Sequence, residues 1–526
     1  MRLVVIAMLM CSAFQVLGQG KVEIVGGGKM TFNQSRNHLY IVQNVVIRHN
    51  GVIIQCDSAI RKMDEGVIEG FGHIYIYQPD TFTLSGGEIL HYQEDSKVAT
   101  VTGKNVVLSD QKMTLTTTSL NYNTQTQTGF YSNGADILNE GTQLKSKKGF
   151  YFRRGNQFFF KDNVQLKHPE YTMYSDTLQY FAGTRTAFFY GPTKIISKEN
   201  TIVCQYGWYN TLSQKAQFSR GATLYADSSV LMADSLLYNN KTGEGEGIGN
   251  IHLYDSAEHI NVYGQRGHYF QKQQLSVIYG QPVAMQAQQK DSMWLLADTF
   301  TFKNDSLHKV LKAFHHTAIC QNEFKGLCDS LVYVFSDSSI RLIGSPILWN
   351  QNNQITGDTM RIGIRKQSVN ALKVIGNAFL ASEVKPNAYN QIAGKNMDNY
   401  FEKNALKSVF VSGNAISVYY IRNNETDSAE YTGINRVMGQ SMRISIDSSR
   451  VSGIKFYNQV EGKMYPLDKL PENEKLLPGL KWQYSRQPNK AMFVERATPK
   501  STIANSKKEA ITPQKTAKKK SKSTRS

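Results

Sequence analysis

Met173-Tyr-Ser-Asp-Thr-Leu-Gln-Tyr180 contains one copy of a pattern that recurs along the chain: apolar, any residue, small, Asp, Ser/Thr, apolar, any residue, aromatic. The same pattern, in full or shortened form, is found at 54–59, 231–238, 295–302, 327–333 and 355–360. With degenerate copies included, it occurs thirteen times, spaced by 29 to 33 residues up to position 358 and more widely beyond it. Such a constant period indicates a tandem-repeat architecture.

A second segment recurs between these copies, in which Gly or Asn lies between short apolar runs. Examples are Tyr190-Gly-Pro-Thr-Lys-Ile195, Ile248-Gly-Asn-Ile251 and Ile375-Gly-Asn-Ala378. Short runs rich in Val, Ile, Tyr, Phe and Thr between turn residues are typical of strands, and no long run has helical periodicity. Each unit therefore supplies two bent strands that cannot bury an apolar face alone. We predict an all-β, elongated repeat β-solenoid of about thirteen two-strand units of ~30 residues, roughly 60–120 Å long.

Each copy of the pattern changes the parity of its apolar residues around the Asp. Met173 and Ser175 are odd-numbered, whereas Leu178 and Tyr180 are even-numbered. A bulge or corner at the Asp would bring both sets to one face. Asp and Ser/Thr suit such a corner because their side chains bond nearby backbone groups. We assign this structural role to a set of six residues: Asp57, Asp176, Asp234, Asp298, Asp329 and Asp358. Cation binding is the alternative, but each repeat offers only one carboxylate, and we expect no metal.

Aromatic residues are more numerous than two thin sheets need for packing, as in Phe158-Phe-Phe160 and Phe188-Phe-Tyr190. If the sheets do not close tightly, such a lining forms a long apolar groove able to hold acyl chains. The alternative is that the same rings simply fill the core. The candidate groove residues are Phe159, Met173, Leu178, Tyr180, Phe189, Leu231, Leu236 and Tyr238.

The sequence offers no candidate active site, so we expect neither enzymatic activity nor a cofactor. A repeated residue marks the scaffold, and no unrepeated acidic cluster, nucleophile elbow or phosphate loop is present. His315 and His316 are adjacent, so in a regular strand they would point to opposite faces. The cysteines beyond the N-terminal segment form no Cys-x-x-Cys pair and are interpreted as small buried side chains: Cys56, Cys204, Cys320 and Cys328.

Both termini differ from the repeats. Residues 1–18 have a basic start, a short apolar run and small or apolar residues before Gln19, which predicts a signal peptide and export. A lipoprotein signal at Cys11 is the less favoured alternative. The formal charge is +18, and residues 487–526 contribute eleven Lys/Arg against two Glu. Half of the excess positive charge therefore lies in this C-terminal stretch and not in the repeats, so we expect no nucleic-acid partner. We expect the stretch itself to be a disordered basic tail from about Pro488.

The tandem pattern behind a signal peptide resembles the OstA-like (organic solvent tolerance) family, which includes periplasmic lipopolysaccharide transport proteins. The resemblance is best over residues 25–250 and continues to about 460. It implies a taco-shaped β-jellyroll whose apolar interior passes acyl chains toward the outer membrane. It also implies two partners: lipopolysaccharide or another envelope lipid, and similar jellyroll modules that pair edge to edge.

The expected organisation is a signal peptide (1–18), an OstA-like jellyroll (19–250), a more divergent continuation (251–465) and a C-terminal segment with the basic tail (466–526). The location implied is the periplasm, with an association with the outer membrane left open. Two other functions stay open. One is a structural or protein-interaction β-solenoid with a filled core, which binds partners by adding strands at its edges. The other is a carbohydrate-active β-helix enzyme, which would need unrepeated acidic residues on one face.

Overall fold

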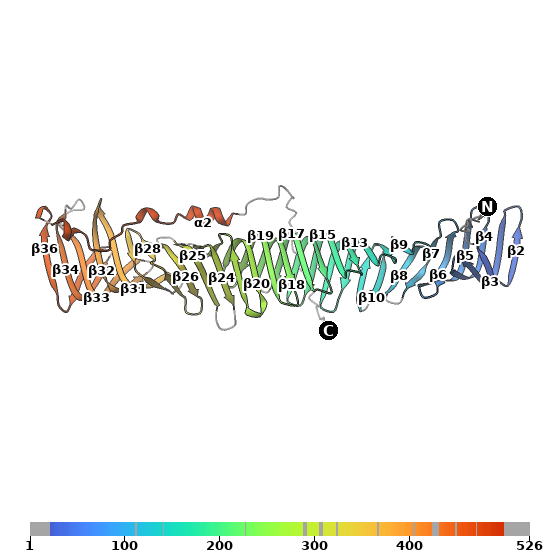
Figure 1. Cartoon of the computed structure of the whole chain (residues 1–526), viewed down its shortest axis with the longest axis horizontal. Coiled ribbons are helices and arrows are strands. Elements are labelled where there is room, and N and C mark those ends of the chain that lie inside the picture. The colour runs from blue at the N-terminus through green and yellow to red at the C-terminus, as the bar shows by residue number, and fades with distance from the viewer. Residues whose placement is uncertain are drawn as a thin grey trace, which may run out of the picture.

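The computed structural model describes residues 21–498 apart from positions 111–112, 140, 227, 288–291, 305–308, 322–323, 366–367, 403–404, 423–430, 448–449 and 470. The described chain forms one antiparallel sheet of 36 strands. The molecule is a long rod in which the strands succeed one another from end to end (Figure 1). This confirms the predicted all-β, elongated repeat fold. The predicted signal peptide lies outside the described residues.

The first half of the array consists of β1 (Glu23–Gly26), β2 (Lys29–Asn33), β3 (His38–His49), β4 (Val52–Lys62), β5 (Val67–Gln78), β6 (Phe82–Gln93), β7 (Val98–Ser109), β8 (Met113–Asn123), β9 (Thr128–Tyr131), β10 (Ala135–Asn139), β11 (Thr142–Ser146), β12 (Lys148–Phe152), β13 (Gln157–Lys167), β14 (Tyr171–Phe181), β15 (Thr186–Ser197), β16 (Asn200–Asn210), β17 (Lys215–Ala226), β18 (Ser229–Asn239), β19 (Glu244–Asp255) and β20 (Ile260–Phe270).

The second half consists of β21 (Leu275–Tyr279), β22 (Val283–Ala287), β23 (Ser292–Leu296), β24 (Thr299–Asn304), β25 (Lys309–Gln321), β26 (Phe324–Val334), β27 (Ser339–Ile343), β28 (Ile347–Asn350), β29 (Asn353–Thr356), β30 (Thr359–Arg365), β31 (Ser368–Lys385), β32 (Ala388–Glu402), β33 (Ala405–Arg422), β34 (Tyr431–Asp447), β35 (Arg450–Tyr457) and β36 (Glu461–Pro466). The helical elements are η1 (Gln271–Gln273), η2 (Leu467–Lys469), α1 (Glu472–Lys475), η3 (Tyr484–Arg486) and α2 (Lys490–Ala497). In the described part of the chain, no helix is long and apolar enough to cross a membrane.

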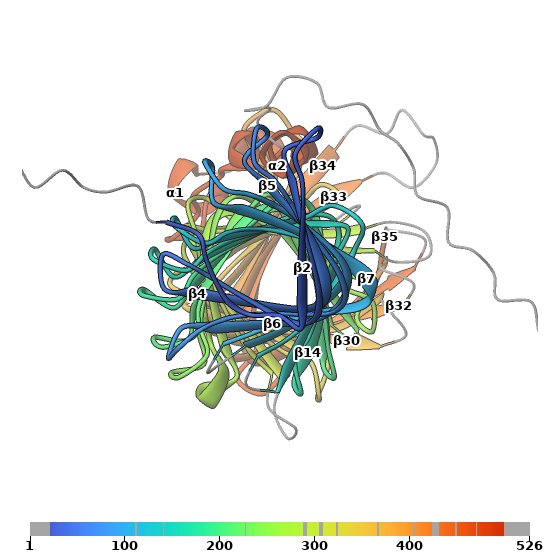
Figure 2. The ribbon, with the colours of Figure 1, turned by 90° about the vertical axis from the view of Figure 1, so that its right-hand side faces the viewer.

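Most long strands are bent in the middle, where the ladder register shifts. In β14 the shift lies between Ser175 and Thr177, at Asp176. The bends of successive strands align into a corner that runs along the rod. The corner divides the sheet into two walls. The first wall contains the strand halves next to short turns such as Asn50–Gly51, and the second wall contains the halves next to longer turns such as Met63–Gly66. We call the gap between the two rows of turns the mouth, and Figure 2 shows these turns projecting around the rod.

The corner is built by a side chain of one strand and the bulge of the next. Asp234 accepts a hydrogen bond of 2.9 Å from the Asn250 side chain, and Asp57 lies 2.7 Å from Nδ1 of His73. Gly249 has a φ of +73°, and a Cβ there would overlap the Asp234 carboxylate, so the turn requires glycine. Asp176, Asp298, Asp329 and Asp358 are also placed at the corner, next to Gly191, His316, His315 and Asn377, respectively.

Residues 467–498 turn back and run along the outer face of the first wall; we call them the return segment. The buried Gln391 side chain holds its backbone at two points, donating to the Lys475 carbonyl over 2.8 Å and accepting from the Leu477 N–H over 2.7 Å. The Gln354 side chain likewise donates to the Lys481 carbonyl and accepts from the Gln483 N–H, each over 2.7 Å. Helix α2 then lies over β22 and β23 (Figure 1).

The return segment corrects the prediction of disorder from about Pro488. Asn489 caps helix α2 by accepting a hydrogen bond from the Ala491 N–H. Phe493 of this helix is fully buried against Val283, Leu296 and Cys320. The prediction failed because these apolar partners lie on the outer face of strands some 170 to 210 residues earlier in the sequence. Residues 499–526 lie outside the described range.

Substitution of Gln391 by Ala is expected to release the return segment. The change leaves the Lys475 carbonyl and the Leu477 N–H without their partner, at about 1–3 kcal/mol for each buried unsatisfied group. Trypsin should then cut at Lys475 and Lys481 many times faster than in the parent protein, as measured by limited proteolysis. Gln459→Ala, at an exposed position, should leave the cleavage rate unchanged. Equal protection of both variants would contradict the proposed anchoring role.

Candidate functional site

Two rows of side chains line the inside of the two walls. On the first wall the row is aliphatic and includes Ile195, Ile202, Leu224, Leu231 and Leu253, each paired directly with the next across the strands. On the second wall large and small residues alternate from strand to strand, in the order Tyr180, Ala187, Tyr209, Ala216, Tyr238 and Gly245. The small residues therefore separate the tyrosine rings along this row.

Polar contacts join the two walls across the mouth near the N-terminal end. Nδ1 of His49 on the first wall lies 2.8 Å from the Tyr92 hydroxyl on the second, and both residues are buried. Lys97 Nζ lies 3.1 Å from the other ring nitrogen of His49. The Tyr151 hydroxyl donates a hydrogen bond of 2.7 Å to Asp110. Because these groups bridge the rows of turns, they close the mouth over this part of the interior.

A second closure lies further along the rod. Lys309, at the start of β25 on the second wall, is 3.1 Å from both Asp255 and Glu258 at the edge of the first wall. All three side chains are at most one-third exposed. Such shielded, multiply paired charges hold two surfaces together more firmly than isolated exposed pairs.

Between the Asp110–Tyr151 and Lys309–Asp255 contacts, no hydrogen bond or ion pair joins the walls across the mouth among the described residues. The rings of Tyr171 and Tyr209 approach each other there, with centroids 6.5 Å apart, and Glu170 and Glu199 of the first wall add to burial in raising the pKa values of Tyr209 and Tyr238, respectively. The inner rows are correspondingly half-buried rather than fully buried, as at Leu224, Leu231 and Tyr238. We call this part, from β13 to β20, the open stretch. Its eight strands span roughly 35 Å at ~4.8 Å per strand.

The predicted groove residues occupy three different positions. Leu178, Phe189 and Leu236 are buried deep in the interior, next to the corner, whereas the buried Met173 pairs with Ile195 and so belongs to the aliphatic row of the first wall. Tyr180, Leu231 and Tyr238 lie further out, on the half-buried inner rows of the open stretch.

The prediction that Phe159 lines the groove is wrong. This residue pairs with Phe150 and Gln179 on the outer face of the second wall, because its neighbours Phe158 and Phe160 point inward and side chains alternate along a strand.

Several lining residues were missed, including Ile195, Ile202, Tyr209, Leu224 and Leu253. The sequence does carry a signal for the tyrosines. Tyr122, Tyr151, Tyr180, Tyr209 and Tyr238 follow one another at intervals of 29 residues, the period of the repeat. A residue type kept at the repeat period marks one row of the folded array. The sequence carries no comparable signal that the mouth is closed near Tyr122 and Tyr151 but open near Tyr209.

The lining of the open stretch is neutral. Burial raises the pKa of Tyr171 to about 12, and burial also raises the pKa values of Tyr209 and Tyr238. Burial raises the pKa of the Cys204 thiol to about 11, so this group stays protonated at neutral pH. Tyrosine hydroxyls near the mouth can still form hydrogen bonds, as between Tyr238 and the Gln271 side chain over 3.1 Å. The surface thus has an apolar floor, and its rim carries neutral tyrosine hydroxyls with Glu170 and Glu199 nearby.

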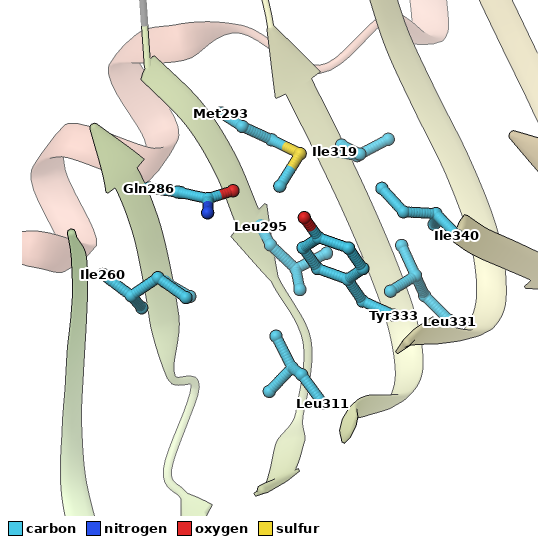
Figure 3. A pocket seen from close by; sticks show the side chains of 10 residues that line it. Ile260, Gln286, Met293, Leu295, Leu311, Ile319, Leu331, Tyr333 and Ile340 are labelled. Atoms are coloured by element: carbon cyan, nitrogen blue, oxygen red, sulfur yellow. The ribbon is translucent and has the colours of Figure 1, made fainter. Parts of the chain in front are cut away.

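The interior beyond the open stretch is filled. A cavity of about 20 Å³ remains among Ile260, Gln286, Met293, Leu295 and Tyr333, whose side chains surround it in Figure 3. This volume corresponds to about one water molecule. The C-terminal half of the interior therefore has no room for a lipid chain at this position.

The described residues show no group of three or more His, Cys, Asp or Glu arranged to hold a metal ion. His315 and His316 do not lie in a regular strand, since both have positive φ in the corner bulge. Nδ1 of His315 lies 3.2 Å from Asp329, and Nδ1 of His316 lies 2.7 Å from Asp298. The hydrogen bond to Asp298 raises the pKa of His316. Both rings are largely exposed and fit the corner pattern.

Of the four cysteines beyond the predicted signal peptide, Cys56, Cys204 and Cys320 are buried and Cys328 is partly buried. Burial raises the pKa of Cys56 to about 11 and that of Cys328 to about 12. These thiols are therefore protonated and serve as small side chains in the packing.

Comparison with known proteins gives one family match. Residues 21–176 match the family described as OstA-like protein, which confirms the predicted resemblance over this part of the chain. The match covers the closed N-terminal part and the beginning of the open stretch. No curated protein matches the sequence. Among solved structures, the WD40 domain of SCAP from fission yeast is 8% identical with a TM-score of 0.10, over 76% of this chain and 97% of that one. This score gives no basis for a shared fold.

Proposed function

We propose that the protein is a periplasmic lipid-binding and bridging protein that holds the acyl chains of lipopolysaccharide, or of another envelope lipid, in the open stretch. The observation that carries this proposal is the neutral, apolar inner surface left uncovered between two closures of the mouth. The OstA-like match over residues 21–176 supports the same class of function.

The chemistry of the open stretch suits an amphiphile. Each CH₂ group moved from water onto the aliphatic row gains about 0.8 kcal/mol. The tyrosine hydroxyls at the rim can bond the polar part of the lipid, because a tyrosine presents an apolar ring and a polar tip. Charged groups of the ligand would stay outside the mouth.

The two ends of the rod support the bridging part of the proposal. At the N-terminal end, Val25, Met30 and Phe32 of β1 and β2 are about half exposed. At the other end, Met464 of β36 is 70% exposed. Exposed apolar residues on terminal strands favour pairing with another sheet. Similar jellyroll modules would extend the interior from chain to chain toward the outer membrane. The change from one core cluster to the next between Ile251 and Ile260 supports a division at residue 250.

The filled interior of the C-terminal half favours a second candidate function there, that of a protein-interaction solenoid. In that case partners would bind by strand addition at the end near β36, and lipid would play no part. The two functions differ in what the open stretch contacts in the cell.

Photo-crosslinking in cells tests the proposal. A photoreactive amino acid at Tyr209 or Tyr238, which point into the open stretch, is expected to capture lipopolysaccharide or another envelope lipid. The same group at Phe159, on the outer face of nearby strands, is expected to capture none. Capture at Phe159 but not at Tyr209 and Tyr238, or capture of proteins alone, would overturn the lipid-binding proposal and favour the interaction solenoid.

A further inference from the structure

The outer face of the second wall carries a single file of cations in the C-terminal half. The file crosses β25, β26, β27 and β30 to β35, one residue per strand; six of its nine positions are Lys or Arg, and the other three are Val332, Asp398 and Phe410. We call these six residues the cation ladder: Lys312, Arg341, Arg361, Lys373, Arg443 and Lys455. All six are exposed. The strands carrying the ladder are drawn from yellow to red in Figure 1.

The ladder places like charges directly opposite each other. Arg341 pairs with Arg361 in the strand register, Arg361 pairs with Lys373, and Arg443 pairs with Lys455. Like charges in directly opposed positions destabilise a sheet. The charges are only partly compensated, by an ion pair of 3.2 Å between Arg361 and Asp337 and a contact of 3.8 Å between Lys373 and Asp398. Among the described residues, Lys312, Arg341 and Lys455 form no ion pair, but Arg341 lies near Asp337, whose pKa is lowered by hydrogen bonds from Ser339 and by the charges of Arg361 and Arg341.

The two rows beside the ladder contain no charged residue. They combine hydroxyl and amide groups with exposed apolar and aromatic side chains. The polar members include Ser330, Thr359, Asn396 and Ser412 on the corner side and Ser408 and Ser445 on the mouth side, and the apolar and aromatic members include Ile343, Ile375, Tyr400 and Tyr457. A line of cations roughly 40 Å long, one side chain wide and flanked by uncharged polar, apolar and aromatic groups, matches the shape of an extended polymer. A flat anionic membrane would instead be matched by basic residues spread over several rows.

We propose that the cation ladder binds a linear acidic polysaccharide that lies along the rod. The carboxylate or phosphate groups of the polymer pair with the cations, and its hydroxyl groups form hydrogen bonds with the Ser, Thr and Asn side chains of the two flanking rows. A single-stranded nucleic acid is the competing occupant that the test must exclude, because such binding uses aromatic platforms for the bases and Tyr400 and Tyr457 are exposed beside the file. The one aromatic residue in the file, Phe410, is covered by Arg443, whose guanidinium lies 5.6 Å from the ring centroid. This surface lies outside the interior and does not depend on lipid binding.

The test uses the full chain with galacturonate oligomers of defined length as the acidic probe and dextran as the neutral probe. The triple variant R341Q/R361Q/K373Q is expected to bind the galacturonate oligomer about tenfold more weakly, with a smaller salt dependence. The matched control K161Q/K194Q/K215Q removes three exposed cations elsewhere on the same array. It should bind as the parent does, and the basic residues 499–526 are identical in all three proteins.

Several outcomes would overturn the proposal. The first is that the ladder variant binds the galacturonate oligomer as tightly as the parent does. The second is that the control variant loses as much affinity as the ladder variant. The third is that dextran binds as tightly as the acidic oligomer. Loss of binding only to phosphatidylglycerol vesicles or to an oligothymidine strand would also overturn it, since another occupant would then be indicated. Thermal melting checks the fold, and relief of the opposed charges is expected to leave the melting temperature of the ladder variant unchanged or raised.

Discussion

The double variant L224D/L231D is expected to lose lipid binding by about tenfold or more, because an uncompensated carboxylate in apolar surroundings costs a few kcal/mol. Leu224 and Leu231 lie directly opposite each other in the aliphatic row of the open stretch. Two carboxylates there would also repel each other and bring water into the groove. The amount of lipopolysaccharide that co-purifies with the protein, determined by mass spectrometry, measures the effect.

The neighbouring pair in the sequence provides the matched control. Tyr225 and Met232 are on the same two strands but on the outer face, with exposures of 47% and 37%. The variant Y225D/M232D adds the same two charges and should keep the lipid. Circular dichroism shows whether both variants remain folded, and L224S/L231S serves as a milder inner-face variant. Unchanged lipid content in a folded L224D/L231D protein would rule out the open stretch as the binding surface.

The second large effect is expected from Gly207→Ala. Gly207 lies on the inner face of the second wall, where it pairs with the buried Phe189 on one side and the buried Phe218 on the other. A Cβ at this position would overlap the Phe189 ring and lie 2.5 Å from the main-chain oxygen of Gln217. The ring cannot leave without opening the core, and the oxygen belongs to the paired strand β17. Overpacking of this kind costs about 1–3 kcal/mol and more where backbone must move.

Hydrogen exchange can locate the damage as well as measure it. In an array whose units contact only their neighbours, the loss of protection should be concentrated in β15 to β17 and fade toward both ends. Gly183→Ala is the control, because a Cβ at Gly183 meets no atom within 4 Å. Loss of protection spread evenly over the rod would contradict a quasi-linear array, and full protection in the Gly207 variant would contradict the packing described.

The sequence predicted the parts of this molecule that depend on neighbouring residues or on the repeat period. The parity change around Asp176 is a local feature, and the structure has its register shift at that residue. Phe159 shows the limit of such reasoning. A run of three phenylalanines gives no indication of which ring points inward, because that depends on where the preceding turn sets the register of the strand.

The amino-acid sequence by itself determined a period of about 29 residues, an all-β array and an elongated shape, because these follow from short-range patterns repeated many times. Tertiary structure decided where the array is open. His49 meets Tyr92, Asp110 meets Tyr151 and Lys309 meets Asp255, so each closure joins residues 41 to 54 positions apart. Gln391 and Gln354 hold the return segment across even longer separations. Such contacts depend on how far each wall twists and on which strands face each other, and no single repeat contains that information.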